Sequence, residues 1–260
     1  MKCKICHNES TYIFSSILLN KHNVSYFFCP FCNFLQTEEP YWLEESYNEA
    51  INKSDTGIFE RNFYYREKTA ILIYHFFDKN KKFLEYAGGY GILTRLMRDI
   101  GFDFYWSDKY SKNLFGRGFE YNETHSNIEL ITTFESFEHF NEPIKEIETM
   151  LAISDSVFFS TELLPSPIPQ PDNWWYYGLD HGQHISFYSI KTLNYLAQKY
   201  NLNLYTNKNN FHLLTKNDIK EKYFIKLLCS KNKLFEKIKH KMESKTMNDY
   251  YYITEEILRK

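Results

Sequence analysis

The sequence predicts an α/β protein with a small metal-binding region near its N-terminus. From about residue 81 to 216, apolar strand-like runs alternate with amphipathic helical stretches, which is typical of a mostly parallel sheet covered by helices. Residues 83–91 (FLEYAGGYG) place three glycines within four positions directly after an apolar run. Two Cys-x-x-Cys pairs precede this region. These three observations define the expected organisation of the chain.

Composition limits the class of protein. With 260 residues, 43% of them hydrophobic, the chain is long enough for one large α/β domain and a small additional region. Its many aromatic residues and few glycines and prolines argue against disorder. A net charge of -2 gives no general attraction to nucleic acid, and we expect no nucleic-acid partner. The polar start MKCKICHNES and the absence of a long apolar run predict a cytoplasmic protein without a membrane span.

Four cysteines have the spacing of a zinc ribbon. Two short pairs separated by a longer insert are the usual ligands of one structural Zn²⁺, although disulfides or free thiols would also use four cysteines. Strand-like runs at residues 11–18 and 24–28 lie between the pairs, so we expect the ribbon to span residues 1–38. The fifth cysteine, Cys229, lies in an apolar helical stretch and is expected in the core. The predicted zinc ligands are Cys3, Cys6, Cys29 and Cys32.

Residues 39–80 are predicted to form a helical segment ahead of the main domain. A short helix is expected at residues 41–51 and a longer one at 63–77, separated by the break SDTGIFERN. The segment could serve as a lid over a ligand site or as a plain polar linker. If it is a lid, its candidate ligand contacts are Tyr47, Asp55, Thr56, Arg61 and Tyr64.

The main domain is expected over residues 81–216. Gly101 is a typical residue after the end of a helix, and Asn141 with Pro143 is a typical start. The stretch 109–126 is too short for a helix and a strand, which predicts a truncated crossover. The predicted strands are residues 83–86, 102–107, 128–133, 156–161, 202–206 and 211–215, and the predicted helices are residues 92–100, 141–154 and the stretch that begins at Ser189.

The glycine-rich stretch suits a strand that turns sharply into a helix. Glycine allows the backbone to bend and a ligand to approach closely. Asp108 follows the next apolar run, FDFYW, and an acid at the end of a second strand can bind ribose hydroxyls. A ligand-free glycine turn is the alternative. The dinucleotide fingerprint G-x-G-x-x-G does not occur here.

These residues resemble the class I S-adenosylmethionine-dependent methyltransferases, whose first motif reads (D/E)-x-G-x-G-x-G. Here the motif reads EYAGGYG at residues 85–91, with alanine at the first glycine, and Asp108 follows it. Residues 134–139 (FESFEH) are similar to the FE-x-x-EH segment of methyltransferases that modify sugars and other small metabolites. With the cysteines included, the resemblance covers about residues 1–215. It implies a Rossmann-like fold with a mostly parallel seven-stranded sheet, and S-adenosylmethionine contacts from Glu85, Ala87, Gly88, Gly89, Gly91, Asp108 and Phe134.

Two further stretches could carry the chemistry. Ligands of open α/β sheets bind outside the carboxyl ends of the strands, so Glu138 and His139 are expected beside the transferred methyl group. The loop WWYYGLDHGQH at residues 174–184 combines aromatic faces with hydrogen-bonding groups, which suits a carbohydrate ring. Core packing of the aromatics and purely structural histidines are the alternatives. We expect acceptor contacts from Trp174, Trp175, Tyr176 and His181, and a general base in His139 or His184 with Glu138 assisting.

The expected reaction is O-methylation of a carbohydrate, such as a nucleotide-linked sugar or a sugar of a surface or capsular polysaccharide. A hydroxyl acceptor must lose its proton, and histidine is the side chain best suited to take it near neutral pH. Sugar C-methyltransferases share the zinc-binding N-terminal domain but usually carry a further C-terminal domain, which favours oxygen as the acceptor here. The alternatives are a C- or N-methyltransferase acting on a small metabolite, and a non-catalytic zinc-ribbon binding protein with a degenerate cofactor site.

Residues 217–260 are predicted to form a helical tail. Residues 216–245 hold ten Lys or Arg against four Asp or Glu, beside an apolar stripe. Such a helix usually docks on its own domain with a solvated basic face. Contact with a membrane surface, an anionic acceptor or another subunit is the alternative, and a homodimer is possible.

Overall fold

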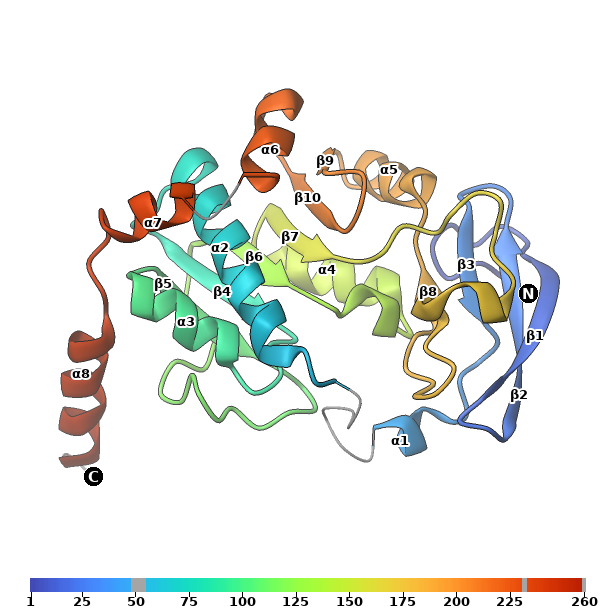
Figure 1. Ribbon diagram of the computed structural model, residues 1–260, viewed down its shortest axis with the longest axis horizontal. Coiled ribbons are helices and arrows are strands. Elements are labelled where there is room, and N and C mark those ends of the chain that lie inside the picture. Colours follow the sequence, from blue (N-terminus) through green and yellow to red (C-terminus); the bar gives the residue numbers. More distant parts are fainter. Residues whose placement is uncertain (48–54, 231–232, 259–260) are drawn as a thin grey trace. The chain divides into compact units, whose positions relative to one another are not determined.

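A computed structural model of the protein describes residues 1–47, 55–230 and 233–258 (Figure 1). The chain forms two compact units, each assembled from segments that are distant in the sequence. Unit 1 comprises residues 1–53, 134–152 and 158–218, and unit 2 comprises residues 54–133, 153–157 and 219–260.

Unit 1 contains a four-stranded antiparallel sheet that includes the predicted ribbon. Both predicted ribbon strands are present, and their order in the sheet is β1-β2-β3-β8. β3 was not predicted, because it is short and mixes polar with apolar residues. Residues 185–187 are strand-like in the sequence and contain β8, but the pairing of β8 with β3 joins segments far apart in the chain and was not predicted. The strands are β1 (Thr11–Leu18), β2 (His22–Cys29), β3 (Phe34–Thr37) and β8 (Ser186–Phe187).

The core of this sheet is aromatic. Tyr26, Trp42, Tyr177 and Phe187 are almost fully buried in one cluster, and Trp42 Nε1 donates to the carbonyl of Gly182 at 2.8 Å. Trp42 precedes α1 (Leu43–Ser46), the described part of the helix predicted at residues 41–51, whose residues 48–51 lie outside the described part of the chain. The ribbon strands thus obtain a hydrophobic core from residues outside the predicted ribbon.

The rest of unit 1 supplies strands and helices of the predicted main domain. Helix α5 begins at Ser189, as predicted, through a capping box: Ser189 Oγ accepts from Thr192 N at 3.1 Å, and Thr192 Oγ1 accepts from Ser189 N at 3.2 Å. The elements are the 3₁₀ helix η1 (Phe137–His139), α4 (Pro143–Ile153), β7 (Ser156–Ser160), η2 (Pro171–Asn173), η3 (Trp175–Tyr177), α5 (Ile190–Lys199), β9 (Asn203–Thr206) and β10 (Phe211–Thr215). The last residue of α4, Ile153, and the first two residues of β7, Ser156 and Val157, belong to unit 2.

Unit 2 is built around three parallel strands. β4 pairs in parallel with both β5 and β6, while α2 packs against α3. α2 begins five residues before the predicted helix at 63–77, because the predicted break SDTGIFERN ends in helix rather than in loop. The elements are α2 (Ile58–Phe76), β4 (Lys82–Tyr86), α3 (Ile92–Ile100), β5 (Asp103–Ser107) and β6 (Ile128–Thr133).

The main sheet is mixed and Rossmann-like, with the strand order β5-β4-β6-β7-β10-β9. β9 and β10 are antiparallel, as expected for a closing pair. The expectation of seven strands is wrong for the described residues, which form six. The truncated crossover at 109–126 contributes only an isolated bridge between Trp106 and Glu120, so no additional strand arises there.

The C-terminal tail docks on unit 2 as three helices. Asp249 accepts two bonds from the guanidinium of Arg98, at 2.8 and 2.7 Å, and both side chains are buried. This contact supports the docking interpretation of the tail.

Cys229 is exposed, so the prediction that it lies in the core is wrong. It follows the buried residues of α6 and lies past the end of that helix. The helices are α6 (Glu221–Leu228), α7 (Lys233–Lys239) and α8 (Thr246–Leu258).

Among the described residues, every helix is too short or too polar to cross a lipid bilayer.

Candidate active site

The predicted cofactor motif forms a tight loop between β4 and α3, called here the glycine loop (residues 85–91). Ala87, Gly89 and Gly91 have φ values of 55°, 53° and 79°, in the left-handed region that glycine adopts most easily. A Cβ at Gly88 would lie 2.7 Å from Glu85 Cδ and 2.9 Å from Trp106 Cδ1, so only glycine fits there. A Cβ at Gly89 would meet nothing within 4 Å. The loop is therefore packed at position 88 and open at position 89, where a ligand can approach its backbone.

Glu85 holds the loop to the first turn of α3. Its buried Oε2 accepts from Thr94 N at 2.8 Å and from the Thr94 hydroxyl. Burial raises the pKa of Glu85 to about 7, against the opposing effect of the two Thr94 bonds, and the negative charge of Asp108 adds to the rise. Glu85 thus connects the end of β4 to the first turn of α3 and fixes the shape of the loop between them.

Asp108, just beyond β5, fastens the glycine loop from the other side. Its Oδ2 accepts from Gly89 N at 2.9 Å, and its Oδ1 accepts from the backbone N–H groups of Tyr110 and Ser111, each at 2.7 Å. The sequence placed Asp108 near the glycine loop, and the structure brings the two together. The carboxylate is only partly buried, so it remains accessible to a ligand hydroxyl.

Two residues that the sequence analysis missed complete this part of the site. Trp106 Nε1 donates to the carbonyl of Gly89 at 2.9 Å, and the indole ring covers Gly88. Asn113 Oδ1 accepts from Gly116 N at 2.9 Å and lies 2.7 Å from the position of a Cβ on Gly91. Trp106 ends the run FDFYW, which could have indicated it, whereas no signal marks Asn113.

The four predicted zinc ligands come together in unit 1 as the cysteine cluster (Cys3, Cys6, Cys29 and Cys32). All four Sγ atoms lie within 4.8 Å of one another, with Cys3 and Cys32 at 3.5 Å and Cys6 and Cys29 at 3.4 Å. Four Zn–S bonds of about 2.3 Å place tetrahedral sulfurs about 3.8 Å apart. The arrangement therefore fits a tetrathiolate zinc site.

A second group of donors in unit 1 is the histidine cluster (Glu138, His139 and His184). Glu138 and His139 lie on η1, and His184 lies in the loop before β8. Their donor atoms are within 4.8 Å of one another. Glu138 is fully buried, His184 is 8% exposed and His139 is partly exposed. The structure thus unites all three residues that the sequence analysis named as catalytic candidates.

Backbone carbonyls fix the tautomer of both imidazoles. His139 Nδ1 lies 3.1 Å from the carbonyl oxygen of Gln183, and His184 Nδ1 lies 2.6 Å from that of Tyr176. Because a carbonyl oxygen can only accept, each Nδ1 carries the hydrogen and each Nε2 keeps a lone pair. The hydroxyl of Tyr47, one of the lid candidates, lies 3.0 Å from His139 Nδ1.

Burial keeps these imidazoles neutral. It lowers the pKa of His139 to about 4, with a further contribution from His181, and it lowers the pKa of His184 well below its ordinary value, with contributions from His139 and His181. At neutral pH both rings are therefore uncharged, and each Nε2 keeps its lone pair.

The predicted acceptor residues divide between core and surface. Trp174 and Tyr176 pack against the aromatic core of unit 1, and the hydroxyl of Tyr176 lies 3.1 Å from Thr161 Oγ1. Trp175 is 75% exposed. His181 packs beside His184, with ring centroids 4.7 Å apart, and its Nδ1 accepts from Gln183 N. Of the aromatic candidates, Trp175 presents the most surface to an acceptor.

The remaining candidates have clear structural contacts. In unit 1, Phe134 packs edge-on against Phe158, with ring centroids 5.3 Å apart. In unit 2, Arg61 forms a bidentate pair with Asp55, with both N–O distances at 2.7 Å. Asp55 precedes α2, and Arg61 lies in its first turn. Thr56 and Tyr64 lie in the same part of unit 2.

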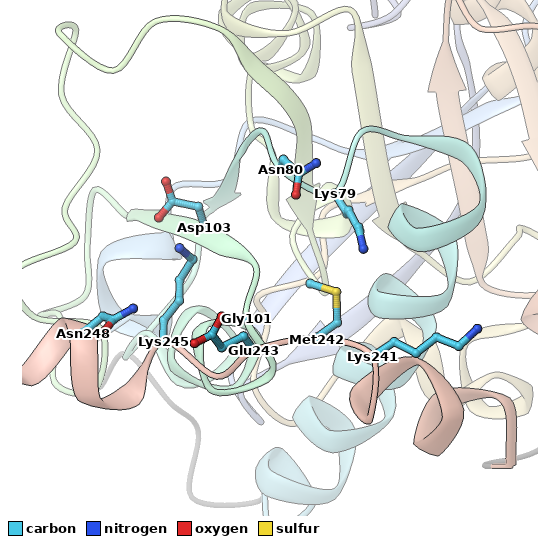
Figure 2. A pocket seen from close by; sticks show the side chains of 9 residues that line it. All are labelled: Lys79, Asn80, Gly101, Asp103, Lys241, Met242, Glu243, Lys245 and Asn248. Carbon is cyan, nitrogen blue, oxygen red and sulfur yellow. The ribbon is translucent and has the colours of Figure 1, made fainter.

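A cavity of about 300 Å³ lies in unit 2, between the end of α3 and the tail (Figure 2). Its lining contains no residue of the glycine loop and none of the histidine cluster. It includes Lys79, Asp103, Lys241, Glu243 and Lys245.

A comparison with protein families matches the part of the chain that contains the glycine loop. The sequence profile of a family described as "Methyltransferase domain" matches residues 59–207, more than half of the 260 residues. No curated protein matches the chain.

Several solved structures match part of the chain at low identity and low TM-score. The plantazolicin methyltransferase BpumL, in complex with SAH, is 10% identical with a TM-score of 0.47, covering 67% of this chain and 90% of its own. OxaC, in complex with sinefungin and meleagrin, is 15% identical with a TM-score of 0.40, covering 53% of this chain and 42% of its own. The magnesium protoporphyrin IX methyltransferase ChlM from Synechocystis PCC 6803, with bound SAH, is 8% identical with a TM-score of 0.40, covering 67% and 94%. The chain thus spans about half the length of OxaC, between 42% and 52% in three OxaC structures.

Proposed function

The chain belongs to the methyltransferase-domain family, and we propose that it is an S-adenosylmethionine-dependent enzyme that methylates a hydroxyl oxygen of a carbohydrate. The proposed acceptor is a nucleotide-linked sugar or a sugar of a surface or capsular polysaccharide. The observation that carries the proposal is the pair of imidazoles, His139 and His184, with both Nε2 lone pairs available.

The glycine loop and Asp108 are the proposed cofactor site. The open backbone at Gly89 allows the close approach of the cofactor, and the Asp108 carboxylate would accept hydrogen bonds from its ribose hydroxyls. S-adenosylmethionine supplies an electrophilic methyl group on a sulfonium. The residues of the loop bind and orient it.

The reaction needs a deprotonated acceptor. With both substrates bound, the acceptor oxygen would form a bond to the methyl carbon while the S–CH₃ bond broke and its electron pair returned to sulfur. The hydroxyl proton would move to Nε2 of His139 or His184, and the Nδ1–H bond to a backbone carbonyl would hold each ring in place. A nitrogen acceptor that is neutral at pH 7 would not need this base, which is why the cluster favours a hydroxyl.

The loop that carries His184 also supplies a surface for the acceptor. Trp175, the first residue of η3, is exposed, and an exposed indole suits the apolar face of a sugar ring. Within the same unit, we propose that the cysteine cluster holds one structural Zn²⁺. The zinc would stabilise the ribbon sheet to which β8, directly after His184, also belongs.

The proposal is tested by incubating the enzyme with S-adenosylmethionine and a panel of sugar nucleotides and oligosaccharides, with mass spectrometry of the products. On the acceptor found, we expect His139→Asn or His184→Asn to lower turnover by about 10²–10⁴-fold, with unchanged affinity for S-adenosylhomocysteine. Asparagine keeps a donor at the Nδ1 position and removes Nε2.

The matched control is His212→Asn. His212 is as deeply buried in unit 1, but both of its ring nitrogens are already bonded, to Thr206 Oγ1 and to the carbonyl of Thr161. Methylation of carbon or nitrogen would contradict the assignment, as would less than a tenfold loss in both cluster variants. A protein that binds the cofactor but methylates nothing in the panel, nor in a panel of small metabolites, would favour a binding role.

A further inference from the structure

We propose that the histidine cluster is a binding site for a divalent transition-metal cation, separate from the cysteine cluster. The chemical class is a cation of the first transition row, such as Mn²⁺, Co²⁺ or Zn²⁺, bound by one carboxylate and two imidazoles. What such a cation does for methyl transfer rests on the proposed function, whereas its binding does not.

The donor set is the first observation. One oxygen of Glu138 and one nitrogen each of His139 and His184 lie within 4.8 Å of one another. Two donors that are each about 2.1 Å from one cation are at most about 4.2 Å apart, so the widest possible pair would need to close by less than about 1 Å. Rotation of side chains achieves such a shift without a change of fold. Two imidazoles and a carboxylate suit Zn²⁺ and its neighbours better than Ca²⁺ or Mg²⁺, which prefer oxygen donors alone.

The orientation of the rings is the second observation. Metal-binding histidines commonly donate their other N–H group to a backbone carbonyl, which fixes the ring and directs the lone pair at the metal. Both His139 and His184 do this, through Gln183 and Tyr176 respectively. His212, also buried in unit 1, shows the contrasting arrangement of a structural histidine, with both nitrogens bonded within the protein.

The electrostatics of the cluster favour a cation. The fully buried carboxylate of Glu138 lies within 4.8 Å of one ring nitrogen of each histidine, and groups rich in electrons repel each other unless a proton or a cation lies among them. The ring of Tyr176 packs against that of His184, with ring centroids 4.7 Å apart. A bound cation would therefore stabilise the cluster.

Open coordination positions give the site a role. Of the three residues in the cluster, His139 is the most exposed, whereas Glu138 and His184 are buried. Three protein donors leave positions for oxygen ligands, and two neighbouring hydroxyls of a sugar can fill them. The cation would lower the pKa of a coordinated hydroxyl. A lone pair that binds the cation cannot also accept a proton, so in the cation-bound enzyme the imidazoles would act as ligands in place of the base role proposed above. The proton displaced from the hydroxyl would then go to a water molecule.

The test is cation binding by the full chain, without cofactor or acceptor. The cysteine cluster is first filled with one Zn²⁺, because thiolates prefer zinc over the harder Mn²⁺. Mn²⁺ is then titrated and followed by the loss of the free-ion signal in electron paramagnetic resonance. We expect about one equivalent of Mn²⁺ to bind to the wild type. Glu138→Gln and His184→Asn should each weaken binding at least tenfold, and His212→Asn should not.

Circular dichroism and the zinc content of each variant show that the fold is retained. No Mn²⁺ or Co²⁺ bound by the wild type at millimolar concentration would overturn the inference, a result that no folding defect can produce. Binding that persists in both cluster variants would also overturn it, because the cation would then lie elsewhere. Methyl transfer to a hydroxyl without cation binding overturns this inference alone, whereas cation binding without methyl transfer to any hydroxyl overturns the proposed function instead.

Discussion

The two units differ in the buried polar groups that mark their candidate sites. In unit 2, two buried charged side chains have protein partners: Arg98 pairs with Asp249, and Glu85 accepts two bonds from Thr94. In unit 1, possible metal ligands gather in two places, four thiols in the cysteine cluster and three donors in the histidine cluster. The charged groups of unit 2 are thus held by other side chains, whereas the two clusters of unit 1 have the composition of metal sites.

The largest expected effect comes from removing one thiol in unit 1. Cys29→Ser leaves three sulfurs around the proposed zinc, and a small ribbon obtains much of its folding free energy from the metal. We expect loss of about one equivalent of zinc and of the native signal of the ribbon strands, measured by metal analysis and by NMR. The control variant is Cys229→Ser, which removes an exposed thiol outside the cluster. This variant should retain the zinc. Equal zinc content in the two variants would show that the cysteine cluster does not hold the zinc.

In unit 2 the corresponding change is Asp249→Ala, which leaves the buried guanidinium of Arg98 with one carboxylate, Asp103, instead of two. Breaking a buried pair by removing one partner costs about 3–5 kcal/mol in the free energy of unfolding. Denaturant unfolding measures this. The control is Asp99→Ala, which removes an exposed partner of Arg95 and should cost under about 1 kcal/mol. Equal costs would show that the tail is not held by the buried pair.

A third prediction uses pH to probe the buried carboxyl of unit 2. The pKa of Glu85 is raised to about 7, whereas an unfolded glutamate titrates near about 4.3. Between these values the folded state binds more protons than the unfolded state, so this group's contribution to stability falls as the pH rises through that range. The free energy of unfolding of wild type relative to Glu85→Gln should fall by about 2–3 kcal/mol from pH 5 to pH 8. The buried histidines of unit 1, which act in the opposite direction, cancel in this difference. A constant difference would mean that Glu85 is ionised throughout.

The sequence predicted what depends on neighbours along the chain. The glycine loop, the start of α3 and the cysteine pairs are each encoded within a few residues, and the structure contains them all. The partners Trp106 and Asn113 of the glycine loop and the pairing of β3 with β8 depend on contacts between distant segments. Periodicity carries no information about such contacts. The resemblance, not the residues, predicted a seventh strand, and the segment at 109–126 forms none.

The histidine cluster illustrates the same limit. The sequence indicated His139 and His184 separately, because each follows a strand or precedes one. It could not show that backbone carbonyls of Gln183 and Tyr176 leave both Nε2 atoms open, since this follows from the fold of one loop. The packing of Trp174 and Tyr176 into the aromatic core was likewise visible only in the structure.

The cofactor site in unit 2 is tested most directly by isothermal titration calorimetry with S-adenosylhomocysteine. We predict that the wild type binds it, and that Asp108→Ala weakens binding by about 1.5–3 kcal/mol, as expected for lost hydrogen bonds to a charged group. Asp108→Asn, which keeps one acceptor oxygen for Gly89 N, should lose less. Equal affinity of Asp108→Ala and the wild type, or no binding by the wild type, would contradict the account.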